Sequence, residues 1–222
     1  MGDVYSIFPL KRKDKNRYHK YAVVLSRHPR FKSLIDLIGL IQPEVPIWPS
    51  IDDAVLYSII GQMLSLSAAS SIIGKLLQEF KTSSAVISWV TKTSNVRGAL
   101  KGVSERKRKA LHAWKIFTEN NHGVWENWKT IPLNDYREQI TNIWGFGRWS
   151  ADMIGIFHLG RMDIWPESDA GIKKSCRLVF KTDQYHKIKR HISGCETVAA
   201  IYLWELLNRK LVNVLREKIS GG

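Results

Sequence analysis

One acidic residue stands where a helix is expected to begin. Asp169 follows Pro166 and opens the helical pattern of residues 169–180. A carboxylate fixed in a water-poor cleft can stabilise positive charge on a reacting group, and it can orient or deprotonate an attacking water. The commonest role of Asp at a helix start is to cap backbone N–H groups. Both interpretations stay open on the residue alone, and Glu167 is the competing carboxylate.

Two glycines lie upstream, between two helical patterns. Gly145 and Gly147 allow backbone torsions that other residues avoid, so the segment predicts a very tight turn. A phosphate can approach such a backbone closely, and the N–H groups of the turn and of the next helix then point at the anion. Arg148 adds a cationic side chain, and Ser150 follows in the first helical turn. The segment either grips a nucleic-acid backbone or simply joins two helices.

These residues need a helical framework, and the sequence predicts one. Apolar residues recur at helical spacing and alternating strand patterns are nearly absent, so we expect an all-α chain of about ten helices. Ser50 or Asp52 is expected to cap one helix, and Ser104 another. Helices are expected over 68–80, 84–91, 95–100, 105–120, 133–143, 149–159, 169–180 and 195–218. The apolar side of the helix over 105–120 is expected to hold Leu111, Trp114, Ile116 and Phe117.

The 222 residues suffice for one hydrophobic core or for two small lobes that share a cleft, and the arrangement expected is two helical lobes with the active-site cleft between them. Residues 1–50 would supply a basic arm, whose first twenty residues are aperiodic, and helices that pack with the C-terminal part. Residues 51–165 would form the central lobe, which ends in a helix–hairpin–helix at 133–159. Residues 166–222 would complete the second lobe.

Charge narrows the class of partner. The 222 residues include 34 Lys and Arg against 20 Asp and Glu, a net charge of +14. Such an excess favours a polyanion, because each neutralised phosphate releases counterions. Nine Trp and seven Tyr interleave with the basic residues, which favours nucleic acid over a membrane surface. No apolar run approaches a membrane span and the first residues lack a secretion signal, so we expect an intracellular protein.

The cysteines and histidines of the sequence do not have the spacing of a metal or redox site. Cys176 and Cys195 are the only cysteines, too few and too far apart for a zinc site or a four-cysteine iron–sulfur cluster. The seven His are scattered, without an H-x-x-x-H pair. We expect no cofactor and no metal ion held by side chains.

The order of these motifs resembles that of the helix-hairpin-helix DNA glycosylases. That family has a pattern close to L-P-G-(aliphatic)-G-x-x-(T/S)-A, followed further along by an Asp ahead of a helix. Residues 143–151 here read IWGFGRWSA, with Trp144 for the usual Pro and Phe146 for the usual aliphatic residue. Residues 56–65 (LYSIIGQMLS) and 102–111 (GVSERKRKAL) resemble two further family segments, the second as G-x-S-x-x-K-x-x-x-L.

The resemblance implies a DNA N-glycosylase close to the 3-methyladenine-DNA glycosylase II branch, with Asp169 as its catalytic carboxylate. Cleavage of a glycosidic bond builds positive charge on the sugar, which a fixed carboxylate stabilises. Relatives that also cut the strand carry a lysine two positions after the second glycine, where this chain has Trp149. The resemblance therefore implies hydrolysis by water, without lyase chemistry.

The same resemblance assigns a base pocket and a wedge. Trp149 and Trp204 align with pocket tryptophans of that branch, and Met153 falls where the branch has a tyrosine. Aromatic faces of this kind attract a cationic alkylated base. Gln62 and Met63 fall on the loop that enters the duplex when the damaged base flips out. Core packing stays an alternative for the tryptophans and for Met63.

The implied partner is double-stranded DNA that contains a damaged base, bound by a monomer. Gly145, Gly147, Arg148 and Ser150 would hold its backbone, and relatives bound to DNA also place a Na⁺ or K⁺ on hairpin carbonyls. Two alternatives stay open. One is a mismatch glycosylase that acts on uracil or thymine opposite guanine, and the other is a non-catalytic DNA-binding protein with the same hairpin.

Overall fold

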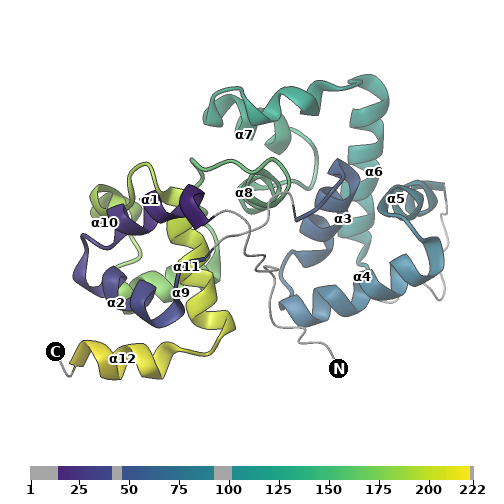
Figure 1. Ribbon diagram of the computed structural model, residues 1–222. Coiled ribbons are helices and arrows are strands. Elements are labelled where there is room, and N and C mark those ends of the chain that lie inside the picture. Colours follow the sequence, from purple (N-terminus) through teal and green to yellow (C-terminus); the bar gives the residue numbers. More distant parts are fainter. Residues whose placement is uncertain (1–14, 42–46, 93–101, 221–222) are drawn as a thin grey trace. The chain divides into compact units, whose positions relative to one another are not determined.

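Helices make up every regular element of the computed structural model, which describes residues 15–41, 47–92 and 102–220 (Figure 1). The all-α prediction is therefore confirmed for this part of the chain. Within the same residues, no helix is long and apolar enough to cross a lipid bilayer. The helix predicted over 95–100 and most of the predicted arm lie outside the described residues.

The chain divides into two compact units, with boundaries at 44/45 and 161/162 where the sequence predicted 50/51 and 165/166. Unit 1 comprises Met1–Glu44 and Met162–Gly222, and unit 2 comprises Val45–Arg161. The helices of unit 1 are α1 (Lys15–Leu25), α2 (Pro29–Ile38), α9 (Ala170–Val179), α10 (Tyr185–Ile192), α11 (Glu196–Asn208) and α12 (Val212–Ser220). Those of unit 2 are α3 (Ile51–Gly61), α4 (Leu66–Phe80), α5 (Ser83–Lys92), α6 (Glu105–Asn120), the 3-10 helix η1 (Val124–Lys129), α7 (Leu133–Thr141) and α8 (Arg148–Phe157).

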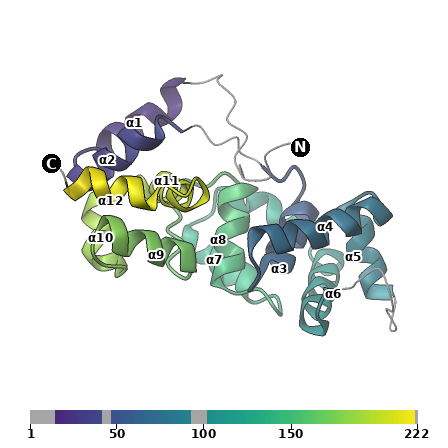
Figure 2. The ribbon, with the colours of Figure 1, turned by 90° about the horizontal axis from the view of Figure 1, so that it is seen from below.

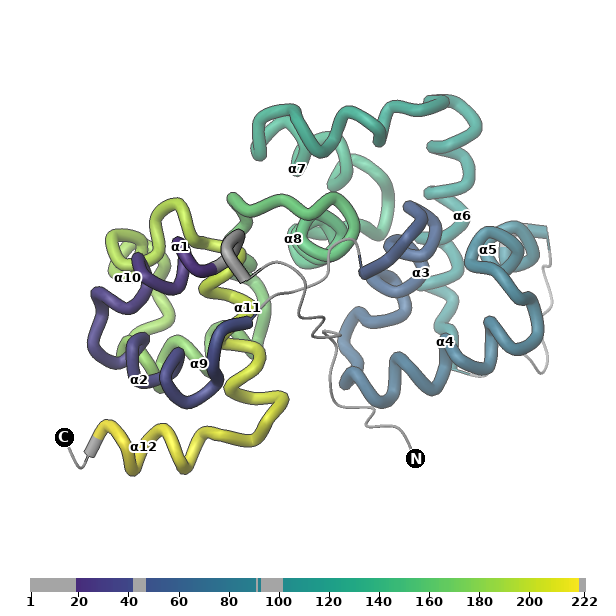
Figure 3. The backbone as a smooth tube through the Cα atoms, viewed as in Figure 1, coloured from purple at the N-terminus to yellow at the C-terminus, as the bar shows by residue number. Residues whose placement is uncertain are grey.

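The central helix of unit 2 is α3. Ser50 caps its start as predicted: the Ser50 hydroxyl accepts the Asp53 N–H, and the Asp53 carboxylate accepts the Ser50 N–H. Buried residues surround almost the whole helix, as is typical of a helix inside a core. Helices α4, α5, α6 and α8 pack around it (Figure 3).

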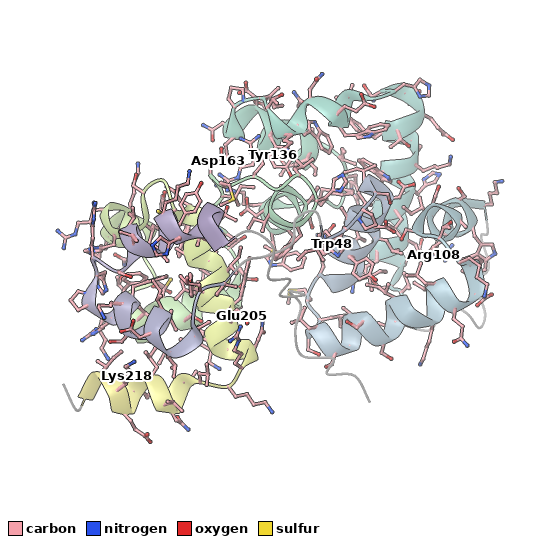
Figure 4. All side chains as sticks on the ribbon, viewed as in Figure 1. Trp48, Arg108, Tyr136, Asp163, Glu205 and Lys218 are labelled. Atoms are coloured by element: carbon pink, nitrogen blue, oxygen red, sulfur yellow. The ribbon has the colours of Figure 1, made fainter. Side chains whose placement is uncertain are left out.

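Aromatic side chains fill the part of unit 2 between α6 and α7. Trp114 and Trp128 are fully buried, with ring centroids 6.3 Å apart. The indole N–H of Trp114 donates to Asp52 and that of Trp128 donates to Gln139, so both buried donors are satisfied. Tyr136 on α7 (Figure 4) donates its hydroxyl to a backbone carbonyl of α8. The cluster also contacts the turn between α7 and α8, because the rings of Trp114 and Phe146 have centroids 6.1 Å apart.

The central helix of unit 1 is α11, which is buried on nearly all sides and packs against α2 and α9. Figure 2 shows α11 between α1 and α2 on one side and α9 and α10 on the other. The Tyr202 hydroxyl accepts the Ile41 N–H and donates to the Gly39 carbonyl, which ties the end of α2 to α11. Helix α9, which follows the candidate catalytic residue, is therefore held by the core of its unit.

The structure corrects several helix predictions. The long helix expected over 195–218 is two helices, α11 and α12, because Lys210 takes a left-handed backbone with a φ of 57° (Figure 3). Helix α10 was missed, and it begins after Gln184, which makes no side-chain cap. Helix α1 begins at Lys15, within the stretch expected to be aperiodic. Ile116, expected in the core, is exposed on α6.

Candidate functional site

The two hairpin glycines have different surroundings. Gly145 has a φ of 86°, and a Cβ there would lie 2.4 Å from the Cβ of Ala110 on α6. A Cβ at Gly147 would meet no atom within 4 Å. Gly145 is thus required by the turn and by its packing on α6, whereas the backbone at Gly147 is open to an approaching group.

Phe146 anchors the hairpin to the aromatic cluster of unit 2. Its side chain is buried, and its ring centroid lies 6.1 Å from that of Trp114. The Phe146 N–H donates to the Ile143 carbonyl and closes the turn. Phe146 therefore packs its ring against the aromatic cluster at Trp114.

Arg148, predicted to contact DNA, lies at the first position of α8 and is half exposed. Its Nε lies 3.5 Å from Oδ1 of Asp152, one turn further along α8. Asp152 is fully buried, and the same Oδ1 accepts from Nε and Nη2 of Arg137 on α7 at 2.9 and 2.6 Å. Burial raises the pKa of Asp152 to about 6, against the opposing effect of Arg137 and Arg148. This carboxylate links the two helices of the hairpin and orients Arg148.

The Ser150 side chain is 1% exposed and bonds to a residue of the same unit. The place of residue 150 in a DNA-binding hairpin stays a prediction. The Ser150 Oγ accepts a hydrogen bond of 2.9 Å from Nε2 of Gln62, which also donates to the Gly145 carbonyl at 3.0 Å. Gln62, predicted to contact DNA, thus has its amide group directed to the hairpin. It joins the loop after α3 to the turn before α8.

This geometry predicts that Gln62→Leu destabilises the protein by about 1–3 kcal/mol, because a buried hydroxyl and a carbonyl lose their donor. The shape-matched variant Gln62→Glu should cost at least as much, since a carboxylate has no N–H for the Gly145 carbonyl. Urea denaturation of the wild type and both variants measures this. Coincident unfolding midpoints for all three proteins would contradict the assigned role.

Met63 lies next to this anchored residue and is 101% exposed. It has a φ of 58°, an uncommon backbone for a residue with a side chain. The alternative that Met63 packs in the core is therefore wrong. An apolar, fully exposed side chain on a loop held against the hairpin is compatible with the predicted wedge.

The segment G-x-S-x-x-K-x-x-x-L has a structural role in unit 2. Ser104 caps α6 through its hydroxyl, as predicted, and Leu111 is fully buried. The Lys107 ammonium donates to the Ile60 carbonyl at the end of α3 at 2.7 Å, and burial lowers the pKa of Lys107. The sequence signalled this segment by resemblance alone, and the structure supplies its reason: Lys107 completes the helix that leads into the wedge loop.

Asp169 is the N-cap of α9, as the capping interpretation of its position requires, and its catalytic role stays a prediction. Its Oδ1 accepts the Ile172 N–H at 2.9 Å and the indole N–H of Trp204 at 3.0 Å. Trp204, on α11, is half buried. A Cβ at Gly171 would lie 3.1 Å from the same oxygen, so a small residue is favoured there. The competing carboxylate, Glu167, is exposed on the preceding turn. Two donors on one oxygen hold the Asp169 carboxylate in a single orientation.

The remaining pocket candidates lie on α8 in unit 2. Trp149 is half buried, and a Cβ at Gly61 would lie 3.3 Å from its indole. Met153 is almost completely buried. Unit 2 therefore brings Trp149 together with the end of α3, beside Gln62, while unit 1 brings Asp169 together with Trp204. Their role in a base pocket stays a prediction.

The fold defines a class of protein. The chain has the helix-hairpin-helix DNA glycosylase fold: it is similar to the Schizosaccharomyces pombe 3-methyladenine DNA glycosylase (Mag1), solved in complex with abasic DNA, with a TM-score of 0.73 at 23% identity over 84% of this chain and 95% of that one. A Bacillus halodurans DNA-3-methyladenine glycosidase gives a TM-score of 0.64 at 24% identity, over 82% of this chain and 86% of that one.

Sequence comparison adds homologues. The chain is 27% identical over 181 residues to the alkylbase DNA glycosidase-like protein mag2 of Schizosaccharomyces pombe, over 71% of this chain and 79% of the relative. A shorter stretch of 76 residues is 36% identical to DNA-3-methyladenine glycosylase 1 of the same organism, over 31% of this chain and 32% of the relative. No protein-family model matches the chain. Its homologues are alkylbase and 3-methyladenine DNA glycosylases.

Proposed function

We propose that this protein is a monofunctional DNA glycosylase of base excision repair that hydrolyses the N-glycosidic bond of alkylated purines, such as 3-methyladenine, after base flipping. The observation that carries the proposal is the Asp169 carboxylate, held by the Ile172 N–H and the Trp204 indole at the motif position that follows the hairpin. The sequence similarity of the chain to alkylbase and 3-methyladenine DNA glycosylases supports the proposed substrate class.

The chemistry follows from charge. As the bond between C1′ and the purine nitrogen breaks, its electron pair leaves with the base and positive charge develops on the sugar. The fixed carboxylate of Asp169 stabilises that charge and orients the water that attacks C1′. The attacking water loses a proton to the carboxylate or to solvent. The carboxylate needs no reorganisation during the reaction, because its orientation is already set by two donors.

Alkylation makes a purine both cationic and a better leaving group. The indole rings of Trp149 and Trp204 would attract such a base by about 0.5–2 kcal/mol. Met153 would take the pocket position for which the resemblance gives a tyrosine. At Trp149 the chain has no amine for a Schiff base, so strand cleavage is not part of the proposed activity. Borohydride should accordingly trap no covalent complex with abasic DNA.

The proposed partner is duplex DNA with a damaged base, bound by a monomer inside the cell, without an organic cofactor or a metal ion held by side chains. A Na⁺ or K⁺ on the hairpin carbonyls belongs to the same proposal. The Gly145 carbonyl already accepts the Gln62 amide, but a carbonyl has a second lone pair for a cation. DNA affinity in KCl and in tetramethylammonium chloride of equal ionic strength tests this cation.

Free-base release tests the function directly. The purified protein is incubated with methylated genomic DNA, and the bases released are identified by mass spectrometry. We expect 3-methyladenine to be released. Oligonucleotides with uracil or thymine opposite guanine should stay intact. Release of uracil alone would replace the proposal with a mismatch glycosylase, and no release at all would leave a DNA-binding protein.

The exposed Met63 gives a further prediction. Met63→Ala should lower excision from duplex DNA about tenfold, because the hole left by the flipped base is no longer filled. Excision from a single-stranded oligonucleotide should change little, since no stack has to be held open there. Single-turnover rates on both substrates measure the ratio. Equal losses on the two substrates would argue against a wedge.

A further inference from the structure

Exposed apolar side chains lie on the wedge loop between α3 and α4 and on the hairpin between α7 and α8. Of the eight large apolar side chains that the described residues expose, Met63 and Leu64 lie on the wedge loop, Leu66 begins α4, and Trp144 lies on the hairpin. Gln62 joins the segments, because its amide donates to the Gly145 carbonyl at 3.0 Å. Residues 63 and 144 directly adjoin the two bonded residues. We call these four side chains the wedge–hairpin surface.

Trp144 is the member of this surface that the wedge does not explain. Its side chain is 52% exposed on the turn between α7 and α8. The other large apolar hairpin residue, Phe146, is buried against Trp114. A single exposed apolar residue is common on a protein surface, but several on neighbouring segments are a mark of an interaction surface. The Trp144 side chain offers a flat π-face with one N–H donor, which suits another flat ring.

Positive charge flanks this surface. Gly145 packs directly on Ala110 of α6, so the first turns of α6 lie beside the hairpin. That part of the helix reads ERKRK and exposes Arg106 and Lys109. Arg148 is half exposed on the other side of the turn. A strand of nucleic acid matches this pattern, with base faces against apolar rings and phosphates against cations.

We propose that Trp144 is a DNA contact that stacks on the face of an unpaired base, while Arg106 and Lys109 hold the phosphates of the same strand. The inference rests on the proposed function in that a flipped base leaves neighbouring or opposing bases unpaired. It goes beyond that function by assigning a second base contact, separate from the pocket and from Met63.

The test compares the affinity of Trp144→Ala for three fluorescein-labelled DNAs: a single strand, a duplex with a one-nucleotide bulge and a fully paired duplex. We expect about fivefold or greater loss on the single strand and the bulge, and a smaller loss on the paired duplex. Trp144→Phe should retain most of the affinity. The matched control is Ile116→Ala, which removes an exposed apolar side chain from α6 and should change nothing.

The charge arm of the proposal is tested with the double variant Arg106→Ala and Lys109→Ala. The double variant should lose affinity for all three DNAs to a similar degree, and the salt dependence of its binding should be smaller. Unchanged affinity of Trp144→Ala, or an equal loss on paired and unpaired DNA, overturns the stacking contact. Self-association of the wild type that Trp144→Ala abolishes would overturn it in favour of a protein interface. Because binding needs no excision, a protein that releases no base still tests this inference.

Discussion

Asp169→Asn is expected to lower base release by at least about 100-fold while DNA affinity stays close to that of the wild type. The amide oxygen can still accept from the Ile172 N–H and from the Trp204 indole, and Asn caps helices as well as Asp does. The variant therefore removes the negative charge and keeps the local structure. Single-turnover excision from methylated DNA and fluorescence anisotropy on an abasic-site analogue measure the two quantities.

The matched control is Glu167→Gln, which neutralises an exposed carboxylate two residues earlier. It should excise bases at the rate of the wild type. If Asp169→Asn keeps full excision activity and Glu167→Gln loses it, the catalytic carboxylate is Glu167 and the assignment to Asp169 is wrong. Loss of DNA affinity in Asp169→Asn, in step with activity, would mean that the residue serves binding or folding instead of chemistry.

The second large effect is expected at Asp152. Asp152→Ala removes the carboxylate that the buried Arg137 guanidinium contacts through two nitrogens, and should destabilise the protein by about 3–5 kcal/mol. Replacing both residues, Asp152→Leu with Arg137→Met, should restore much of that loss, because no buried charge is left without its counter-charge. Urea denaturation of the single and double variants measures the difference. A double variant as unstable as Asp152→Ala would show that shape, not charge, matters there.

The same carboxylate predicts a pH dependence. Burial raises the pKa of Asp152 from the ordinary aspartate value of 3.8 to about 6, so between these two pH values the folded protein binds a proton that the unfolded chain has released. The contribution of this group to stability is therefore fully present below pH 4 and is lost as the pH rises through 6. The stability of the wild type relative to Asp152→Asn should fall over this interval. A constant difference would contradict the raised pKa.

Local signals in the sequence were enough to place the caps and the hairpin. Ser104 caps α6 as predicted, and of the two candidates Ser50 and Asp52 it is Ser50 that caps α3. Asp169 caps α9, the alternative to its catalytic role, because a side-chain oxygen before an apolar-periodic run acts within one turn. The break between α11 and α12 could not be predicted in this way. Its left-handed residue is Lys210, and no Gly or Pro marks the position.

Long-range partners could not be read from the sequence. The resemblance placed Gln62 on the wedge loop and Ser150 in the hairpin, but it did not indicate the hydrogen bond that joins their side chains across 88 positions of the chain. Arg137 and Asp152 carried no signal of their pairing, since nothing local distinguishes them from surface charges. Trp144 was noted only as a departure from the family pattern. Its exposure is a tertiary property, set by which hairpin residue faces the aromatic cluster.

The unequal surroundings of the hairpin glycines have a consequence for separating folding defects from binding defects. A methyl group added at position 145 meets Ala110, so the whole turn must move and the protein's stability reports the damage. The same methyl group at position 147 has open space around it within the protein. Gly147→Ala should therefore leave the protein's stability unchanged and lower only its affinity for DNA. A substitution at position 147 thus separates an effect on DNA binding from an effect on folding.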